Sequence, residues 1–410
     1  MGFLNHIEDI SINGTWVGDL IYDTYLRSKN LPTIDWTSAS FAQHLNESVE
    51  TYIAWEGFLK KNNNVRAINI SHCVYNTAIP LRIGLNKGIA VYQVNVTHAY
   101  RLKTQNMFAY NDFHYFPEQF SELPRNLQNA GKIEAKKRIE KRFSGVVGVD
   151  MSYSKKSAYG KLMKKRLLRE TSQKKILVAT HCFFDSPHSY GNNMFPDFYE
   201  WLTFLGELSK TTNYEWYLKV HPDYLPGTMD VINSFVNRYP KFNLLPAEAS
   251  HNQIIKEGIN CALTVYGTIG FEYAALGIPV INASTNNPHV AYGFNLHPKS
   301  IAEYQKILLN LEQLDLKINI NEVYEYYFMR FILNTENLFF NNYQEMIENI
   351  GGYKEQFKPL IYDVWINEYT QERHKEILHA IDKFIDSGDF LMDYSHFGKE
   401  FSMKSIDLKK

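Results

Sequence analysis

The segment Val265–Glu272, VYGTIGFE, holds residues whose types and spacing could bind a phosphate. Glycines at Gly267 and Gly270 let a backbone come close to a ligand, and Thr268 is placed to cap a following helix whose free N–H groups favour an anion. Glu272 would repel a phosphate, so we expect it to accept hydrogen bonds from ribose hydroxyls of the same nucleotide. The same spacing is equally typical of a capped helix whose glycines serve close packing.

His221 and Pro222 form a second stretch with chemical potential. A histidine just after a buried strand, fixed by a proline that cannot continue the strand ladder, is a suitable rigid donor to a phosphate oxygen. An ordinary loop histidine would fit the same position. We keep both interpretations, because the expected position of His221 beside the turn at Tyr266–Thr268 makes a phosphate contact about as plausible as an ordinary loop position.

The loop THCFFDSPHSYG offers His181, Asp185 and His188. Two histidines and an aspartate could bind a divalent metal ion. Nothing fixes the three on one helical face, and no further ligand cluster is evident. We expect hydrogen-bonding contacts from this loop, with no metal and no other cofactor.

Alternating elements position these residues. Apolar strand-like runs separated by helical segments predict a doubly wound parallel sheet over residues 175–310. The expected strands are Lys175–Cys182, Tyr214–Pro222, Phe242–Pro246, Cys261–Gly267 and Ile278–Ser284. Ligands bind beyond the carboxyl ends of such strands, so His181, His221 and Tyr266 should meet at one crevice.

The rest of the chain is expected to form further units. At 410 residues it exceeds the usual size of a single core, so two domains are expected. In the first part, Arg66–Cys73 and Gly88–Asn95 resemble strands around a helix, which predicts a parallel pair. We predict an α/β domain over 1–150, a basic linker over 151–174, a second α/β domain over 175–310, and a helical segment over 311–410 that packs on both.

Bulk composition narrows the function classes. The net charge of −1 gives no indication of nucleic-acid binding, and three scattered cysteines suit a reducing compartment. The N-terminus shows no basic region followed by an apolar core, so we expect no signal peptide, and no run reaches the roughly 20 apolar residues of a membrane helix. We expect a soluble cytoplasmic protein. The basic segment 132–175 is either a solvated helical linker or a face that lies peripherally on the inner membrane surface.

The stretches LKVHP (Leu218–Pro222) and VYGTIGFEYAALGIPVI (Val265–Ile281) resemble the C-terminal domain of GT-B glycosyltransferases, especially those of bacterial capsule and surface polysaccharides such as the capsule Kdo transferases. The resemblance covers about a third of the chain. It implies two Rossmann-like domains facing a cleft, with residues 1–150 on the acceptor side and residues 175–310 binding the nucleotide sugar. It also implies a nucleotide-sugar donor held by His221, Pro222, Tyr266, Gly267, Thr268, Gly270 and Glu272. The N-terminal part matches less well and lacks an obvious first strand, so that domain is either abbreviated or truncated.

An inverting transfer needs a base for the acceptor proton. Candidates from the first domain are Asp19, Asp23, His72 and His98, and Asp19 is expected to be the best exposed because it follows a glycine where a loop enters a helix. Asp19 could instead simply help to start that helix. We assign the catalytic role to Asp19 together with His181 and Asp185.

The leading hypothesis is a transferase that moves a sugar from a nucleotide to a growing capsule or lipopolysaccharide glycan, on a saccharide or lipid-linked saccharide acceptor. One alternative is a CDP-polyol phosphotransferase of the teichoic-acid type. Another is a non-catalytic protein that binds a glycan or nucleotide sugar during assembly. A metal-dependent hydrolase using His181, Asp185 and His188 is the least favoured.

Overall fold

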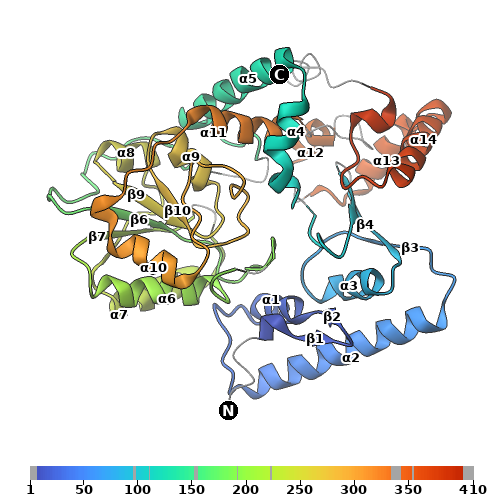
Figure 1. Cartoon of the computed structure of the whole chain (residues 1–410), viewed down its shortest axis with the longest axis horizontal. Coiled ribbons are helices and arrows are strands. Elements are labelled where there is room, and N and C mark those ends of the chain that lie inside the picture. The colour runs from blue at the N-terminus through green and yellow to red at the C-terminus, as the bar shows by residue number, and fades with distance from the viewer. Residues whose placement is uncertain are drawn as a thin grey trace.

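The computed structural model describes residues 7–95, 98–109, 111–151, 156–191, 193–221, 224–333, 343–352 and 355–399. Pro222, which the resemblance assigns to the donor site, lies outside them. The described chain contains a five-stranded sheet, a three-stranded sheet and a two-stranded hairpin, with helices packed around them (Figure 1). The predicted α/β class is confirmed.

The five-stranded sheet is entirely parallel and has the order β10-β9-β6-β7-β8. Its strands are β6 (Lys175–Ala179), β7 (Glu215–Lys219), β8 (Phe242–Leu244), β9 (Cys261–Thr264) and β10 (Val280–Asn282). The chain runs outward from β6 through β7 to β8, and then places β9 and β10 on the other side of β6. This is the doubly wound sheet predicted from the sequence, and its topological switch point lies between β6 and β9.

Helices cover both faces of this sheet, which is why its strands are continuous apolar runs. Ile176 and Val178 point into the layer formed by α6 (Phe198–Ser209), α7 (Thr228–Arg238) and α10 (Ile301–Leu309), whereas Leu177 points into the opposite core with α8 (His251–Lys256) and α9 (Ile269–Ala275). Figure 1 shows α8 and α9 on one side of the sheet and α6 and α7 on the other. Successive side chains of β6 therefore stabilise both layers.

The N-terminal region has a smaller, mixed sheet. β3 and β4 pair in parallel around α3, as the sequence predicts, and β5 pairs antiparallel with β4. The elements of this region are η1 (Ile7–Asp9), β1 (Ser11–Ile12), β2 (Thr15–Trp16), α1 (Gly18–Lys29), α2 (Ala39–Lys61), β3 (Ala67–Ile70), η2 (Asn76–Ala78), α3 (Ile79–Asn86), β4 (Ala90–Val94), β5 (Ala99–Leu102), η3 (Asn111–Tyr115), α4 (Phe116–Glu122) and α5 (Arg125–Phe143).

The first residue of α1 must be a glycine. A β-carbon on Gly18 would lie 1.9 Å from the Ile7 carbonyl oxygen and 2.5 Å from the Ile10 amide nitrogen. Both are backbone atoms that cannot move aside cheaply. The segment GTWVGDL is therefore a short β-strand followed directly by a helix that starts beneath η1.

The C-terminal segment is mostly helical and packs on both sheets. Its elements after α10 are η4 (Leu311–Gln313), α11 (Ile320–Tyr327), the π-helix η5 (Phe328–Leu333), α12 (Tyr343–Asn349), α13 (Pro359–Glu368), α14 (Gln371–Ser387) and η7 (Tyr394–Phe397). α11 and η5 share an aromatic core with α5 and α9. The chain after α14 covers the edge of β5, where the Arg101 N–H donates to the Phe390 carbonyl at 2.8 Å.

The basic segment 132–175 is helical only as far as Phe143 in the part that the structure describes. Its first part belongs to α5, where Arg138 forms an ion pair with Asp150 at 2.6 Å. Residues 156–174 form no helix, and two of them, Tyr159 and Leu168, are buried. The domain boundaries and the peripheral membrane contact stay predictions. Among the described helices, none is long and apolar enough to cross a membrane.

Candidate functional site

His181 lies at the switch point, where β6 ends, and contacts the end of β9. Its Nε2 atom is 3.0 Å from the Thr264 hydroxyl oxygen and accepts a hydrogen bond from the Val265 N–H at 3.1 Å. Because Nε2 is an acceptor, the neutral ring is assigned its hydrogen on Nδ1. Burial, reinforced by the charge of His221, lowers the pKa of His181 to about 3. The ring is therefore neutral at physiological pH.

His221 follows β7 and is exposed, on the other side of β6 from the β9 turn. Since β9, β6 and β7 are parallel neighbours, their carboxyl ends lie side by side at one edge of the sheet. Burial and nearby charges, among them His221, lower the pKa values of His181 and His251. The structure thus brings together His181, His221 and the Tyr266–Thr268 turn, a set that we call the rim.

Close packing explains Gly267, in the turn after β9, and Gly270, in the first turn of α9. A β-carbon on Gly267 would lie 2.8 Å from the Thr264 hydroxyl oxygen, and one on Gly270 would lie 2.4 Å from the ring of buried His289. Thr268 precedes α9, but its side chain makes no capping hydrogen bond, so the predicted cap is wrong. The packing interpretation that the sequence left open accounts for both glycines without a ligand.

Tyr266 joins the rim to the loop that follows β6. Its ring lies 4.8 Å from that of His181, 5.2 Å from that of Tyr190 and 5.5 Å from that of Phe198, measured between centroids. Its hydroxyl donates to the Ser186 carbonyl at 3.0 Å. Burial and the neighbouring Tyr190, Asp185 and Asp23 raise the pKa of Tyr266 well above its usual value. The tyrosine is a fixed, neutral wall of the rim.

Glu272 does not point freely toward a ligand. It is buried, and its two carboxylate oxygens accept separate hydrogen bonds, one from the Arg142 guanidinium at 2.6 Å and one from the Tyr159 hydroxyl at 2.8 Å. These contacts tie α9 to α5 and to the segment after residue 156. The expected ribose contact would require Arg142 or Tyr159 to release the carboxylate, so the structure gives Glu272 a cross-linking position instead.

Asp19 is buried, and the expectation that it would be the best exposed candidate base is wrong. Its carboxylate pairs with the Arg82 guanidinium at 2.6 Å, and the two side chains are 1% and 0% exposed. Arg82 in turn lies 4.5 Å from the Trp16 ring centroid. A carboxylate held by two guanidinium hydrogen bonds is a poor acceptor for a substrate proton.

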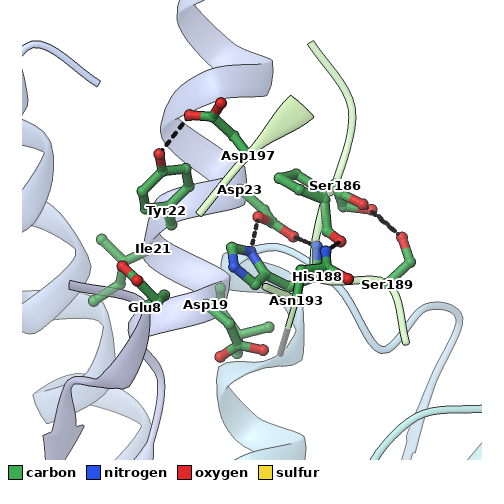
Figure 2. A network of polar contacts seen from close by, with 12 residues as sticks. Glu8, Asp19, Ile21, Tyr22, Asp23, Ser186, His188, Ser189, Asn193 and Asp197 are labelled. Atoms are coloured by element: carbon green, nitrogen blue, oxygen red, sulfur yellow. Dashed lines mark hydrogen bonds and ion pairs between the residues drawn. The ribbon is translucent and has the colours of Figure 1, made fainter. Parts of the chain in front are cut away.

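A buried polar network joins α1 to the loop between β6 and α6 (Figure 2). His188 Nδ1 lies 2.6 Å from an Asp23 carboxylate oxygen, and the His188 backbone N–H donates to the other oxygen at 3.2 Å. The Tyr22 hydroxyl donates to Asp197 at 2.6 Å, and Asp197 caps α6. Burial raises the pKa of Asp23 to about 6 despite the opposing charge of His188. Burial alone would lower the pKa of His188, but Asp23, Asp19 and Glu8 outweigh it and raise it.

Asp185 is the exposed member of the predicted catalytic set. It accepts hydrogen bonds from the Tyr75 hydroxyl at 2.6 Å and from the Ser186 N–H at 3.0 Å. His181, Asp185 and His188 thus have three different partners. In the described part of the chain, no group of three or more histidine, cysteine, aspartate or glutamate residues could hold a metal ion.

Sequence reasoning named Asp23 and His188 separately and missed their pairing, because 165 residues separate them. It also missed Arg142, Tyr190, Asn111 and Asn286. None of these lies in a short motif. The position of Asp23 one helical turn after Asp19 indicates that the two carboxylates share a face of the predicted helix, but it indicates no partner for either.

Fold and site together define an α/β protein with a polar and aromatic rim at the switch point of a parallel sheet. No family model and no curated protein matches the chain. The chain is similar to two solved structures of Thermosulfurimonas dismutans KpsC. The first is a β Kdo 2,4 transferase, with 13% sequence identity and a TM-score of 0.39, and the match covers 63% of this chain and 78% of that chain. The second is a β Kdo 2,7 transferase, with 14% sequence identity and a TM-score of 0.38, and the match covers 74% of this chain and 85% of that chain. It is also similar to UDP-GlcNAc 2-epimerase from Neisseria meningitidis bound to UDP-GlcNAc, at 13% identity (TM-score 0.30, 80% and 88%).

Proposed function

We propose that this protein is a glycosyltransferase that moves a sugar from a nucleotide donor to a growing bacterial surface glycan. The observation that carries the proposal is the contact between His181 and Thr264 across the switch point, flanked by His221 and by the Tyr266–Thr268 turn. In open α/β sheets nucleotides bind beyond the carboxyl ends of the strands, at a switch point of this kind. The sequence resemblance to capsule-type transferases points to the same edge of the sheet.

In this proposal the rim holds the donor without a metal ion. His221 contacts the phosphate because it is exposed. Its neighbours His181 and His251 are buried, and burial lowers their pKa values so that both rings stay neutral. Gly267 and Thr268 line the same crevice, and Tyr266 forms its aromatic wall. Gly270 and Glu272 belong to α9, which Glu272 links to Arg142 and Tyr159, and they have no direct contact with the donor.

Asp185 is the acceptor base that the geometry favours. It is exposed, it stands in the loop that leaves the rim, and its charge acts on Tyr266. In an inverting reaction its carboxylate takes the proton of the attacking hydroxyl while the sugar leaves the nucleotide phosphate. His181 is neutral and positions Thr264 and the turn. Asp19 takes no part in the chemistry.

The first test is a thermal-shift screen of the full chain against CMP, CDP, UDP and GDP. A nucleotide at 100 times its dissociation constant should add about 2.7 kcal/mol to the free energy of unfolding. We expect His221→Ala to remove that gain for the nucleotide that shows it. His379→Ala is the matched control, because His379 is also exposed but lies on α14.

Product analysis then separates the reaction classes. Transfer of a sugar adds a glycosyl unit to the acceptor, whereas a polyol phosphotransferase adds phosphorus. An epimerase would change the donor with no acceptor present, and a binding protein would change neither. A chain that no nucleotide stabilises, or one whose His221→Ala variant binds as well as the wild type, contradicts the assigned donor site.

A further inference from the structure

A cavity with a volume of about 280 Å³ lies between the N-terminal region and the carboxyl edge of the five-stranded sheet. We call it the Trp16 cavity. Trp16, Phe108 and Tyr115 line it from the N-terminal region, and Tyr190 and Asn286 line it from the other side. Tyr190 also contacts Tyr266, with 5.2 Å between ring centroids. A single tyrosine ring therefore separates the cavity from the rim.

The aromatic wall of the Trp16 cavity is held rigidly. The rings of Trp16 and Phe108 meet edge to face with 6.0 Å between centroids. Arg82 lies over both, 4.5 Å from the centroid of Trp16 and 5.0 Å from that of Phe108, and Asp19 anchors it from behind. The buried Asp19–Arg82 pair thus has a structural purpose, which is to back this wall.

Two asparagine side chains in the lining of the Trp16 cavity have oxygen atoms that accept no hydrogen bond from a described residue. Asn111 is 5% exposed and donates through Nδ2 to the Tyr190 carbonyl at 3.1 Å. Its side-chain oxygen is buried and accepts no hydrogen bond from any described residue, and the same is true of the Asn106 oxygen. Two unused acceptors in one lining are unusual, because buried polar atoms are normally paired. They would be satisfied by hydroxyl groups that donate.

The chemistry of the lining selects the kind of ligand. Among the described residues that line the cavity there is no aspartate, glutamate, lysine or arginine, and His114 is engaged with Asn286 at 2.6 Å. Such a lining gives no counter-charge to a phosphate or a carboxylate. Aromatic faces together with amide groups suit a molecule with apolar ring faces and many hydroxyls. The volume is near the lower end of the about 300–1,000 Å³ usual for small-molecule sites, which suits one sugar ring.

We propose that the Trp16 cavity binds an uncharged sugar residue of the acceptor glycan. This inference rests on the proposed function, since the acceptor must approach the rim from the side that does not hold the nucleotide. A neutral hexose or N-acetylhexosamine unit has the required chemistry, and an acidic sugar does not. The base of the donor nucleotide is the rival occupant, and the experiment is designed to distinguish it.

The test titrates the full chain with methyl glycosides of glucose, galactose, N-acetylglucosamine and an acidic sugar, observed by saturation-transfer NMR and calorimetry. We expect a neutral glycoside to bind and the acidic one not to bind. Tyr115→Ala should weaken the binding about ten-fold, the loss expected for a stacked ring. Tyr362→Ala is the matched control, since Tyr115 is 56% exposed and Tyr362, on α13, is 52% exposed.

The outcomes separate this inference from the donor site. Nucleotide binding that survives Tyr115→Ala, together with lost glycoside binding, supports both. Absence of binding by every neutral glycoside, or binding that is unchanged in both Tyr115→Ala and Asn106→Leu, overturns the saccharide site even if a nucleotide binds. Loss of nucleotide binding in Tyr115→Ala would assign the cavity to the base of the donor nucleotide, and this outcome also overturns the saccharide site.

Discussion

Asp19 and Arg82 form an ion pair whose side chains are 1% and 0% exposed. A buried pair of this kind costs desolvation, and removing one partner leaves the other charge uncompensated. We expect Asp19→Ala to lower the free energy of unfolding by about 3–5 kcal/mol, measured by chemical denaturation. Lys136→Ala, which breaks the solvent-exposed pair with Glu140 on α5, should change it little.

A double variant decides whether Asp19 is structural or catalytic. Asp19→Leu with Arg82→Met replaces the pair by apolar side chains, and such replacements are often neutral for stability. We expect most of the lost stability, and most of the transfer activity, to return. A stable double variant that still binds the neutral methyl glycosides but transfers no sugar would contradict this and return Asp19 to the role of base.

At the scale of single residues, sequence reasoning could predict position along a strand but not the partner of a side chain. The residues His181, His221 and Tyr266 were predicted to share an edge, because each directly follows a buried strand. The role of Glu272 could not be predicted. Its partner Arg142 lies 130 residues away on a helix whose orientation no local pattern fixes.

The long helices α5 and α2 each carry a glycine in their interior, Gly131 and Gly57, and the atoms around these two glycines differ. A β-carbon on Gly131 of α5 would lie 2.7 Å from the ring of Phe328 in η5, whereas one on Gly57 of α2 would meet nothing within 4 Å. The first glycine lets two elements approach closely. The second has no packing reason.

The same substitution should therefore have opposite effects in the two helices. Gly131→Ala forces α5 away from η5 and should destabilise the protein by about 1–3 kcal/mol. Gly57→Ala only removes backbone freedom from the unfolded chain and should stabilise it by about 0.5–1 kcal/mol. Urea denaturation of both variants measures the difference, and equal changes would show that α5 does not pack against η5 as described.

Strands can be predicted from the sequence where burial on both faces produces a continuous run of apolar residues. β6, β7 and β9 are covered on both faces, so their residues form continuous apolar runs that stand out in the sequence. β5 was not predicted as a strand, because AYRL is short and its pairing with β4 depends on the chain beyond it. Its outer edge is covered by residues near 390, a contact between segments that sequence order keeps far apart.

At the scale of the whole molecule, α1 and the loop after β6 are held together by buried polar contacts. Asp23 pairs with His188, Tyr22 donates to Asp197, and Tyr75 of the N-terminal region donates to Asp185. The first two contacts are buried and the third is exposed. A network of this kind makes the relative position of α1 and the rim sensitive to protonation.

The Asp23–His188 pair predicts how stability changes with pH. Both groups have pKa values raised in the folded protein, Asp23 to about 6 and His188 above its ordinary value. The folded state therefore binds these protons more tightly than the unfolded state, and each contribution is largest at low pH. The contribution of Asp23 is lost between about pH 4 and 6, and that of His188 is lost as the pH rises from about 6.5 through its folded value.

We compare the wild type with Asp23→Asn/His188→Gln, which removes both titrating groups and keeps similar shapes. The stability of the wild type relative to this variant should fall steadily as the pH rises from 4 to 9, measured by denaturation at each pH. His379→Gln, on the surface of α14, should give no such slope. A difference that grows with pH would mean that the folded state binds these protons less tightly than the unfolded one. The carboxylates around His188 would then not stabilise its charged form, and the contact between Asp23 and His188 would hold α1 to the loop without the charge of the histidine.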